Sequence, residues 1–131
     1  MLYLAGELGA GKTTLARGFL RACGIAGPIR SPTYTLAQAY ESGTQTLLHL
    51  DLYRLQDAGE LEHLGLTEWA LPGCLWLIEW PQRGGALLPP ADLVVTLAAG
   101  PDGHEASLVA RTAAGAAWLA RMRRNASELK A

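Results

Sequence analysis

Residues 6–14, GELGAGKTT, constrain the fold more than any other part of the chain. The run matches the pattern G-x-x-x-x-G-K-[ST] at every fixed position. Glycines at these positions permit the backbone angles that turn several N–H groups towards one phosphate chain. Such a loop lies between an apolar strand and a helix, whose N-terminus attracts the anion. The pattern therefore predicts an α/β protein that binds a nucleotide.

The sequence on both sides of the loop meets this requirement. Residues 1–5 (MLYLA) are apolar and predict the strand. Residues 12–23 repeat apolar side chains at Leu15, Phe19 and Cys23, and this spacing indicates one face of a helix. We expect Lys12 to reach the β- and γ-phosphates and the Thr13 hydroxyl to bind Mg²⁺. The expected nucleotide-binding residues are Glu7, Leu8, Gly9, Ala10, Gly11, Lys12, Thr13 and Thr14.

The remaining sequence predicts a single α/β domain over residues 1–131, with a mixed sheet and neither repeats nor linkers. Apolar runs bounded by turn residues indicate strands, and two of the turns suggest hairpins. The expected strands are 33–40 and 46–53 around the turn ESG, 75–80, and 92–98 and 106–110 around the turn PDG. Helices are expected over 60–64, where Asp57 and Glu60 resemble a capping box, and over 113–129.

Composition excludes some functions and sets the expected compartment. The formal net charge is −1, with two lysines beside nine arginines, so no field of the whole surface attracts nucleic acid or an anionic membrane. No apolar run approaches the roughly 20 residues of a membrane helix. We expect a cytoplasmic protein in which Cys23 and Cys74 are reduced. A guanine-reading Asn-Lys-x-Asp motif would need another lysine than Lys12 or Lys130, so a GTPase is disfavoured.

Two acidic residues follow apolar runs and are candidates for handling a metal ion and water. Glu79 ends LWLIE, the usual form of a second metal motif, although a surface glutamate at a strand end is the alternative. Asp51 lies within LLHLDLY, where period two places it on the same strand face as His49. A buried acid needs a cation or hydrogen-bond donors, and an ion pair with Arg54 is the simpler alternative to a metal. We interpret His49 as a packing residue.

Residues 31–35, SPTYT, are expected to lie where a nucleotide-sensing switch would sit. A threonine hydroxyl or backbone N–H there can reach the γ-phosphate and order the loop when a triphosphate is bound. A plain Ser-Pro turn is the alternative. The basic cluster Arg121, Arg123 and Arg124 is read as a solvated helix face in preference to an RNA site.

Four motifs in order, GELGAGKTT, SPTYTL, HLDLYRL and IEWPQ, resemble the bacterial TsaE proteins. The resemblance runs from Tyr3 to about Leu88 and is weaker beyond. It implies a P-loop NTPase-like three-layer domain that hydrolyses ATP to ADP with Mg²⁺ in tRNA threonylcarbamoyladenosine synthesis. It also implies a complex with the TsaB–TsaD pair, whose transferase it supports between turnovers, and contact with tRNA only through that complex.

The resemblance also assigns roles to individual residues. It implies that Asp51, Glu79, Lys12 and Thr33 are catalytic, with Thr33 as the switch threonine. It implies that Thr13, Glu79 and Asp51 serve the metal, and that Trp80 and Ser31 lie at the site rim or the partner surface.

The chain departs from the family pattern in two places. Family members usually carry a strand and a helix before the glycine loop, and this chain begins inside the loop's own strand. A Gly-Arg pair that is common in the last hairpin of the family reads Gly103-His104 here. The resemblance therefore assigns neither base contacts nor a role for His104 to this chain.

Two other functions are compatible with the same loop. A small-molecule kinase would need a second substrate pocket and an arginine-bearing lid, and no arginine-rich insertion follows Glu79. A nucleotide sensor would bind a partner without hydrolysing the nucleotide, and its partner function would survive the loss of Glu79.

Overall fold

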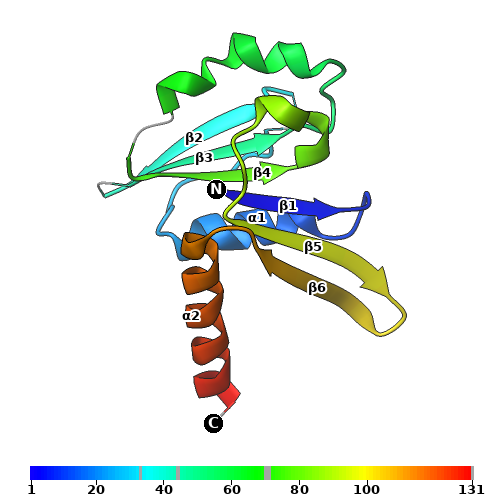
Figure 1. Cartoon of the computed structure of the whole chain (residues 1–131), viewed down its shortest axis with the longest axis vertical. Coiled ribbons are helices and arrows are strands. Elements are labelled where there is room, and N and C mark those ends of the chain that lie inside the picture. Colours follow the sequence, from blue (N-terminus) through cyan, green and yellow to red (C-terminus); the bar gives the residue numbers. More distant parts are fainter. Residues whose placement is uncertain (33, 44, 70–71, 131) are drawn as a thin grey trace.

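The computed structural model describes residues 1–32, 34–43, 45–69 and 72–130 (Figure 1). Its centre is a six-stranded sheet with the strand order β2-β3-β4-β1-β5-β6. The strands are β1 (Leu2–Gly6), β2 (Ala37–Ser42), β3 (Gln45–Asp51), β4 (Cys74–Glu79), β5 (Leu93–Gly100) and β6 (Gly103–Ala110).

The four inner strands are parallel, and each edge strand is the antiparallel arm of a hairpin. β1 pairs with β4 on one side and β5 on the other, and β4 pairs with β3. β2 and β6 pair antiparallel with β3 and β5. Asp51 and Glu79 are register partners at the carboxyl ends of β3 and β4. The edge of the sheet where parallel strands end is the usual place for a ligand in such folds.

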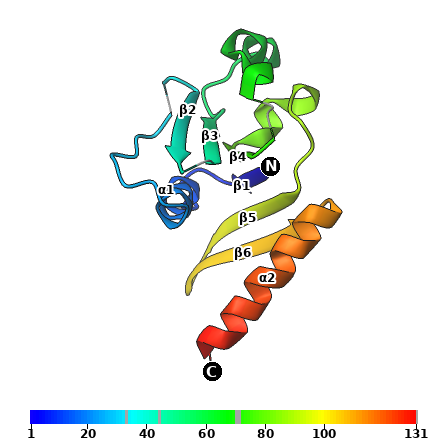
Figure 2. The ribbon, with the colours of Figure 1, turned by 90° about the vertical axis from the view of Figure 1, so that its left-hand side faces the viewer.

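α1 (Lys12–Ala22) and the 3-10 turns lie on opposite sides of this sheet, which makes three layers (Figure 2). α1 and α2 (Ala113–Lys130) pack on one face. On the opposite face lie apolar side chains of η1 (Ala58–Leu64) and η2 (Leu66–Trp69). Two further turns, η3 (Pro81–Arg83) and η4 (Gly85–Leu87), connect β4 to β5.

Alternation along the inner strands supplies both halves of the core. Leu47 and Leu77 face the helices, whereas their neighbours Leu48 and Ile78 face the 3-10 turns. All four are at most 1% exposed. Because period two places His49, Asp51 and Glu79 in phase with Leu47 and Leu77, these polar residues extend the helix-facing side of the sheet towards the glycine loop.

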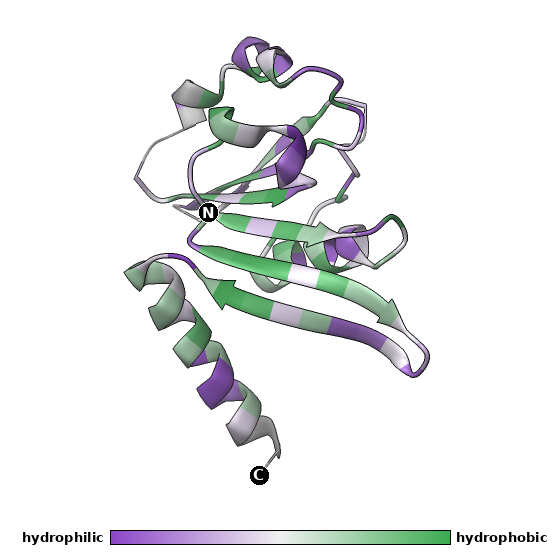
Figure 3. Cartoon of the chain, turned by 45° about the vertical axis from the view of Figure 1, so that its right-hand side comes forward, coloured by the Kyte–Doolittle hydropathy of each residue, from purple (hydrophilic) through white to green (hydrophobic). Residues whose placement is uncertain are grey.

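β6 is hydrophilic near the turn that joins it to β5, and α2 extends beyond the sheet (Figures 1 and 3). His104 lies near this turn, exposed and paired with Ala99. Within the described part of the chain, no helix is long and apolar enough to cross a membrane.

The predicted mixed sheet and both hairpins are confirmed, but one strand begins later than expected. β2 starts at Ala37, because residues 34–36 form a turn before it, and residue 33, where the strand was expected to begin, lies outside the described residues. The Leu36 N–H donates to the Pro32 carbonyl at 2.8 Å, and Leu36 has a left-handed φ of 66°. The predicted helix over 60–64 is the 3-10 segment η1, where the Asp57 side chain accepts the Gly59 N–H.

Candidate functional site

The glycine loop leaves the centre of the sheet at the end of β1 and enters α1. Gly6, Gly9 and Gly11 have φ values of 137°, 81° and 102°, which side chains other than glycine rarely adopt. A Cβ at Gly6 would also lie 2.3 Å from the Leu97 carbonyl oxygen. Gly11 is the N-cap of α1 and supplies no side-chain cap, and the first turn of the helix has no acidic residue. The N-terminal amides of α1 are thus suited to an anion.

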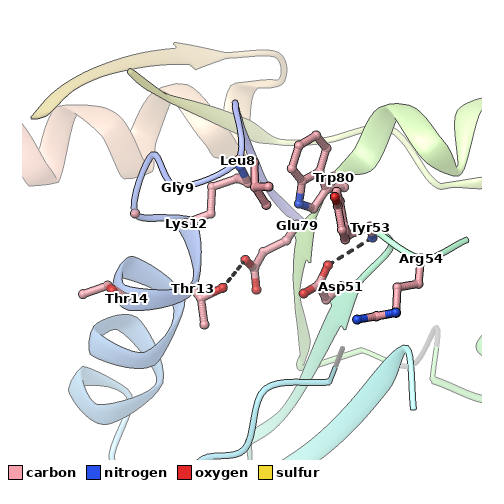
Figure 4. A pocket seen from close by; sticks show the side chains of 11 residues that line it. Leu8, Gly9, Lys12, Thr13, Thr14, Asp51, Tyr53, Arg54, Glu79 and Trp80 are labelled. Carbon is pink, nitrogen blue, oxygen red and sulfur yellow. Dashed lines mark hydrogen bonds between the residues drawn. The ribbon is translucent and has the colours of Figure 1, made fainter. Parts of the chain in front are cut away.

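A cavity of about 420 Å³ opens beside this loop (Figure 4). Its walls come from the loop, the first turn of α1 and the ends of β3 and β4. The lining residues are Leu8, Gly9, Gly11, Lys12, Thr13, Thr14, Asp51, Tyr53, Arg54, Glu79 and Trp80.

Lys12 is a buried cation, only 5% exposed, at the wall of this cavity. Its Nζ donates to the Gly6 and Glu7 carbonyl oxygens at 2.6 and 2.7 Å, and lies 4.1 Å from the centre of the Trp80 ring. Burial lowers the pKa of this ammonium, and the nearby carboxylates, Glu79 foremost, oppose the shift. A phosphate in the cavity would stabilise the charged form further.

Glu79 links the helix to the sheet. Its Oε1 accepts the Thr13 hydroxyl at 3.0 Å, and its Oε2 lies 2.7 Å from His49 Nε2 (Thr13 contact in Figure 4). Glu79 is 1% exposed and His49 is 2% exposed. A carboxylate this deeply buried requires such partners, because desolvation disfavours its charge.

Asp51 is the second acid of the cavity and is 6% exposed. Burial raises the pKa of its carboxyl group, and the hydrogen bond that Tyr53 N–H donates to Oδ1 at 3.1 Å opposes this. The Asp51 N–H donates to the Leu36 carbonyl, which ties the turn at residues 34–36 to this strand end. Among the described residues no ion pair joins Asp51 to Arg54, so the simpler alternative for Asp51 has no support.

Tyr53, Arg54 and Trp80 form the rim of the cavity, and Tyr34 and Arg83, which do not line it, contact these rim residues. The rings of Tyr53 and Trp80 lie 5.0 Å apart, and Arg83 lies 5.8 Å from the Tyr53 ring centre. Arg54 stacks on Tyr34, which is 83% exposed, at 4.7 Å. Trp80 has a left-handed φ of 59°, an uncommon conformation that is often found at functional sites.

The donor set suits Mg²⁺ bound together with phosphates. The described residues contain no group of three or more His, Cys, Asp or Glu side chains placed to hold a metal. Mg²⁺ is usually held by one or two carboxylates plus substrate phosphates and water, not by a full protein cage. The Thr13 hydroxyl and the Glu79 carboxylate, with Asp51 nearby, offer the hard oxygen atoms that this ion prefers.

Comparison with known proteins decides the family. The model for "Threonylcarbamoyl adenosine biosynthesis protein TsaE" matches residues 1–106. This chain belongs to the TsaE family. A TsaE protein of Haemophilus influenzae is 44% identical over 115 residues, which cover 88% of this chain and 73% of that protein. A Bacillus subtilis TsaE protein is 40% identical over 111 residues, or 84% of this chain and 69% of the relative.

A solved structure extends the TsaE likeness to the fold. The crystal structure of Bacillus subtilis YdiB is similar with a TM-score of 0.77 and 30% sequence identity. The similarity covers 95% of this chain and 76% of YdiB. The P-loop-type α/β fold predicted from the sequence is therefore confirmed.

Most residues assigned by the TsaE resemblance meet at the one cavity. Leu8, Gly9, Gly11, Lys12, Thr13, Thr14, Asp51, Glu79 and Trp80 line it. Glu7 is exposed and contributes its carbonyl oxygen to Lys12, while Ala10 is buried. Ser31 is exposed and is not among the described residues that line the cavity, and Thr33 lies outside the described residues.

Sequence reasoning missed three neighbours of this site. Tyr53 and Arg54 line the cavity, and His49 contacts Glu79. Their signal was present in HLDLYR, because period two places His49 and Tyr53 on the face of Asp51. The pairing of His49 with Glu79 depended on β3 and β4 being neighbours, which the pattern of either strand alone does not reveal.

Proposed function

We propose that this chain is an ATPase that acts in tRNA threonylcarbamoyladenosine biosynthesis. One observation carries the proposal: a single cavity joins the Lys12 loop, the Thr13–Glu79 pair and Asp51. These are the groups that phosphoryl transfer to water requires, namely a phosphate cradle, oxygen ligands for Mg²⁺ and a second carboxylate. Membership of the TsaE family supports the biosynthetic role.

Binding of ATP or ADP begins with the loop. Amides at the start of α1 receive the phosphate oxygens, and Lys12 exchanges its contacts with the loop carbonyls for contacts with the β- and γ-phosphates. Thr13 and Glu79 are the residues that would hold Mg²⁺, and the ion would supply positive charge next to the phosphates. The exposed rings of the rim are available to the remainder of the nucleotide.

Hydrolysis forms a bond between a water oxygen and the γ-phosphorus and breaks the bond to the bridging oxygen of ADP. Asp51 is the residue that we assign to orienting this water. A raised pKa makes its carboxylate a better hydrogen-bond acceptor than an exposed aspartate. Thr33, by its place in SPTYT, is the residue that we assign to sensing the γ-phosphate.

The proposed contact with partner proteins rests on the link between the exposed rim and Asp51. Tyr34 belongs to the SPTYT segment, and the Leu36 carbonyl at the end of its turn accepts the Asp51 N–H. A change in this segment on nucleotide binding would alter both the rim and Asp51. We assign the surface of Tyr34, Arg54 and Trp80, with Ser31 nearby in sequence, to contact with a TsaB–TsaD pair, through which tRNA is reached.

The deciding experiment measures phosphate release from Mg-ATP by the purified chain, alone and with TsaB and TsaD. We expect slow release alone and faster release with the partners. Lys12→Ala is the matched control and should release nothing above background. Undiminished release by Lys12→Ala would contradict the proposal.

The same assay separates the two alternatives. Transfer of phosphate to an added nucleoside or sugar in preference to water would indicate a kinase. ATP binding without any release, together with partner function that survives Glu79→Ala, would indicate a sensor.

A further inference from the structure

His49 is a buried histidine that contacts Glu79, one of the two acidic residues that line the cavity. It lies on β3, two residues before Asp51 and on the same strand face. Its register partner on β4 is Leu77, so its side chain reaches diagonally along the sheet to Glu79. The Nε2–Oε2 distance of 2.7 Å is that of a strong hydrogen bond.

Both oxygens of the Glu79 carboxylate are occupied from different elements. Oε1 accepts from Thr13 on α1, and Oε2 contacts His49 on β3. Two contacts on opposite oxygens fix the rotation of the carboxyl group as well as its position. Without His49, the buried Glu79 would lose a donor on one side and be free to turn away from Thr13.

The other ring nitrogen of His49 defines the direction of the hydrogen bond. Nδ1 is buried and has no hydrogen-bond partner among the described residues. A proton on Nδ1 alone would leave that donor unpaired and would point the Nε2 lone pair at a carboxylate oxygen. The proton therefore belongs on Nε2, which donates to Glu79.

We propose that His49 is a positioning residue, which donates from Nε2 to hold Glu79 facing Thr13 so that the two form a ready Mg²⁺ site. The binding of Mg²⁺ at this place rests on the proposed function. The orientation of Glu79 by His49 does not depend on it. Groups that hydrogen-bond to metal ligands commonly change metal affinity in this way, although they do not touch the ion. His49 is thus a part of the site, not a packing residue.

The first test uses the free chain, without nucleotide or metal. Nitrogen-15 NMR should find the His49 ring protonated on Nε2, with a proton that exchanges slowly with water. The other two histidines, His63 and His104, are exposed and should exchange fast. Glu79→Ala should abolish the slow exchange. A ring protonated on Nδ1, or slow exchange that survives Glu79→Ala, would overturn the proposal.

The second test measures the affinity of the chain for a fluorescent ADP analogue. The affinity is measured at increasing Mg²⁺ concentrations and in a chelator that removes Mg²⁺. In the chelator, His49→Leu should bind the ADP analogue as tightly as the wild type. It should need about 10-fold more Mg²⁺ to reach half of the increase in analogue affinity that Mg²⁺ produces. His49→Gln places an amide nitrogen near the position of Nε2 and should restore the wild-type midpoint to within about threefold, whereas His49→Asn is too short and should behave like His49→Leu.

The variants also separate positioning from packing. Loss of affinity with and without Mg²⁺ alike, or equal behaviour of the Gln and Asn variants, would overturn the proposal, and so would an unchanged midpoint in His49→Leu. If the Leu variant does not fold, the contrast between Gln and Asn decides. Failure of the wild-type chain to bind the analogue would refute the proposed function, and the NMR test would still decide the role of His49.

Discussion

At the scale of single residues, burial opposes both kinds of charge at the cavity beside the glycine loop. It lowers the pKa of Lys12 and raises that of Asp51. No described hydrogen bond joins Lys12 to Asp51. Lys12 donates to loop carbonyl oxygens, and Asp51 accepts a backbone N–H. The free site is therefore prepared for a ligand that carries charge, at some expense of stability.

Asp51→Asn should stabilise the free chain at pH 7. Because the native pKa lies above the ordinary value of 3.8, the folded state binds the proton more tightly, and stability falls as pH rises through the interval between the unfolded and folded pKa. Asparagine keeps the oxygen that accepts from Tyr53 and removes the buried charge. We expect a gain of about 1 kcal/mol in the free energy of unfolding.

The measurement is urea unfolding of both proteins between pH 3 and pH 8. The gain should shrink as pH falls from the raised pKa of folded Asp51 to the ordinary aspartate value, and it should level off below that value, where wild-type Asp51 is protonated in both states. A gain that is independent of pH would assign the effect to packing. Phosphate release should fall in the same variant while ADP affinity is kept, because Asp51 is assigned to water and not to nucleotide binding.

At the scale of elements, β1 joins the glycine loop at Gly6. Among the glycines of the loop, Gly6 leaves the least room for a side chain. Gly6→Ala combines a φ of 137° with a Cβ placed 2.3 Å from the backbone of β5, the strand that pairs with β1. Gly103→Ala is the matched control, because its φ is 125° but nothing lies within 4 Å of its Cβ.

Thermal and urea unfolding should separate the two variants clearly. Gly103→Ala should lose about 1 kcal/mol from backbone strain alone, and Gly6→Ala about 3 kcal/mol or more, since β1 and β5 must move apart. Gly6→Ala should also weaken ADP binding, because the loop begins at this residue. Equal losses of stability would mean that the contact with Leu97 is relieved without cost.

Sequence patterns predicted the elements whose signal is local. The strand–loop–helix unit follows from GELGAGKTT and its flanks, and both hairpins follow from their turn residues. The start of β2 could not be read from TYTLAQAY, because the β-branched and aromatic residues suggest a strand where Leu36 turns to a left-handed conformation. That turn is closed by hydrogen bonds to Pro32 and Asp51, and these depend on the fold around it.

At the scale of the whole molecule, the site depends on a strand order that no single segment encodes. Asp51 and Glu79 were recognised as acids at strand ends, and their proximity follows from β3 and β4 being parallel neighbours in register. The His49–Glu79 contact joins residues 30 positions apart. The sequence therefore predicted the members of the site better than their contacts, and it did not assign Tyr53 and Arg54 to the cavity.

Stability and nucleotide binding should be separable across the molecule. Trp118 of α2 packs on the helix-facing core, with its ring centre 5.9 Å from that of Phe19 on α1. The two rings also border an apolar cavity of about 190 Å³, lined by strand residues such as Leu2 and Leu93. Trp118 is not among the described residues that line the cavity beside the glycine loop.

Trp118→Ala should therefore lower the free energy of unfolding by about 2 kcal/mol, less than for a fully buried tryptophan because Trp118 is only partly covered. Arg124→Ala, an exposed change on the same helix, is the control and should alter stability by less than about 0.5 kcal/mol. The affinity of the folded Trp118→Ala protein for Mg-ADP should stay at the wild-type value. A loss of affinity in proportion to the loss of stability would instead show that α2 and the phosphate loop are coupled through α1.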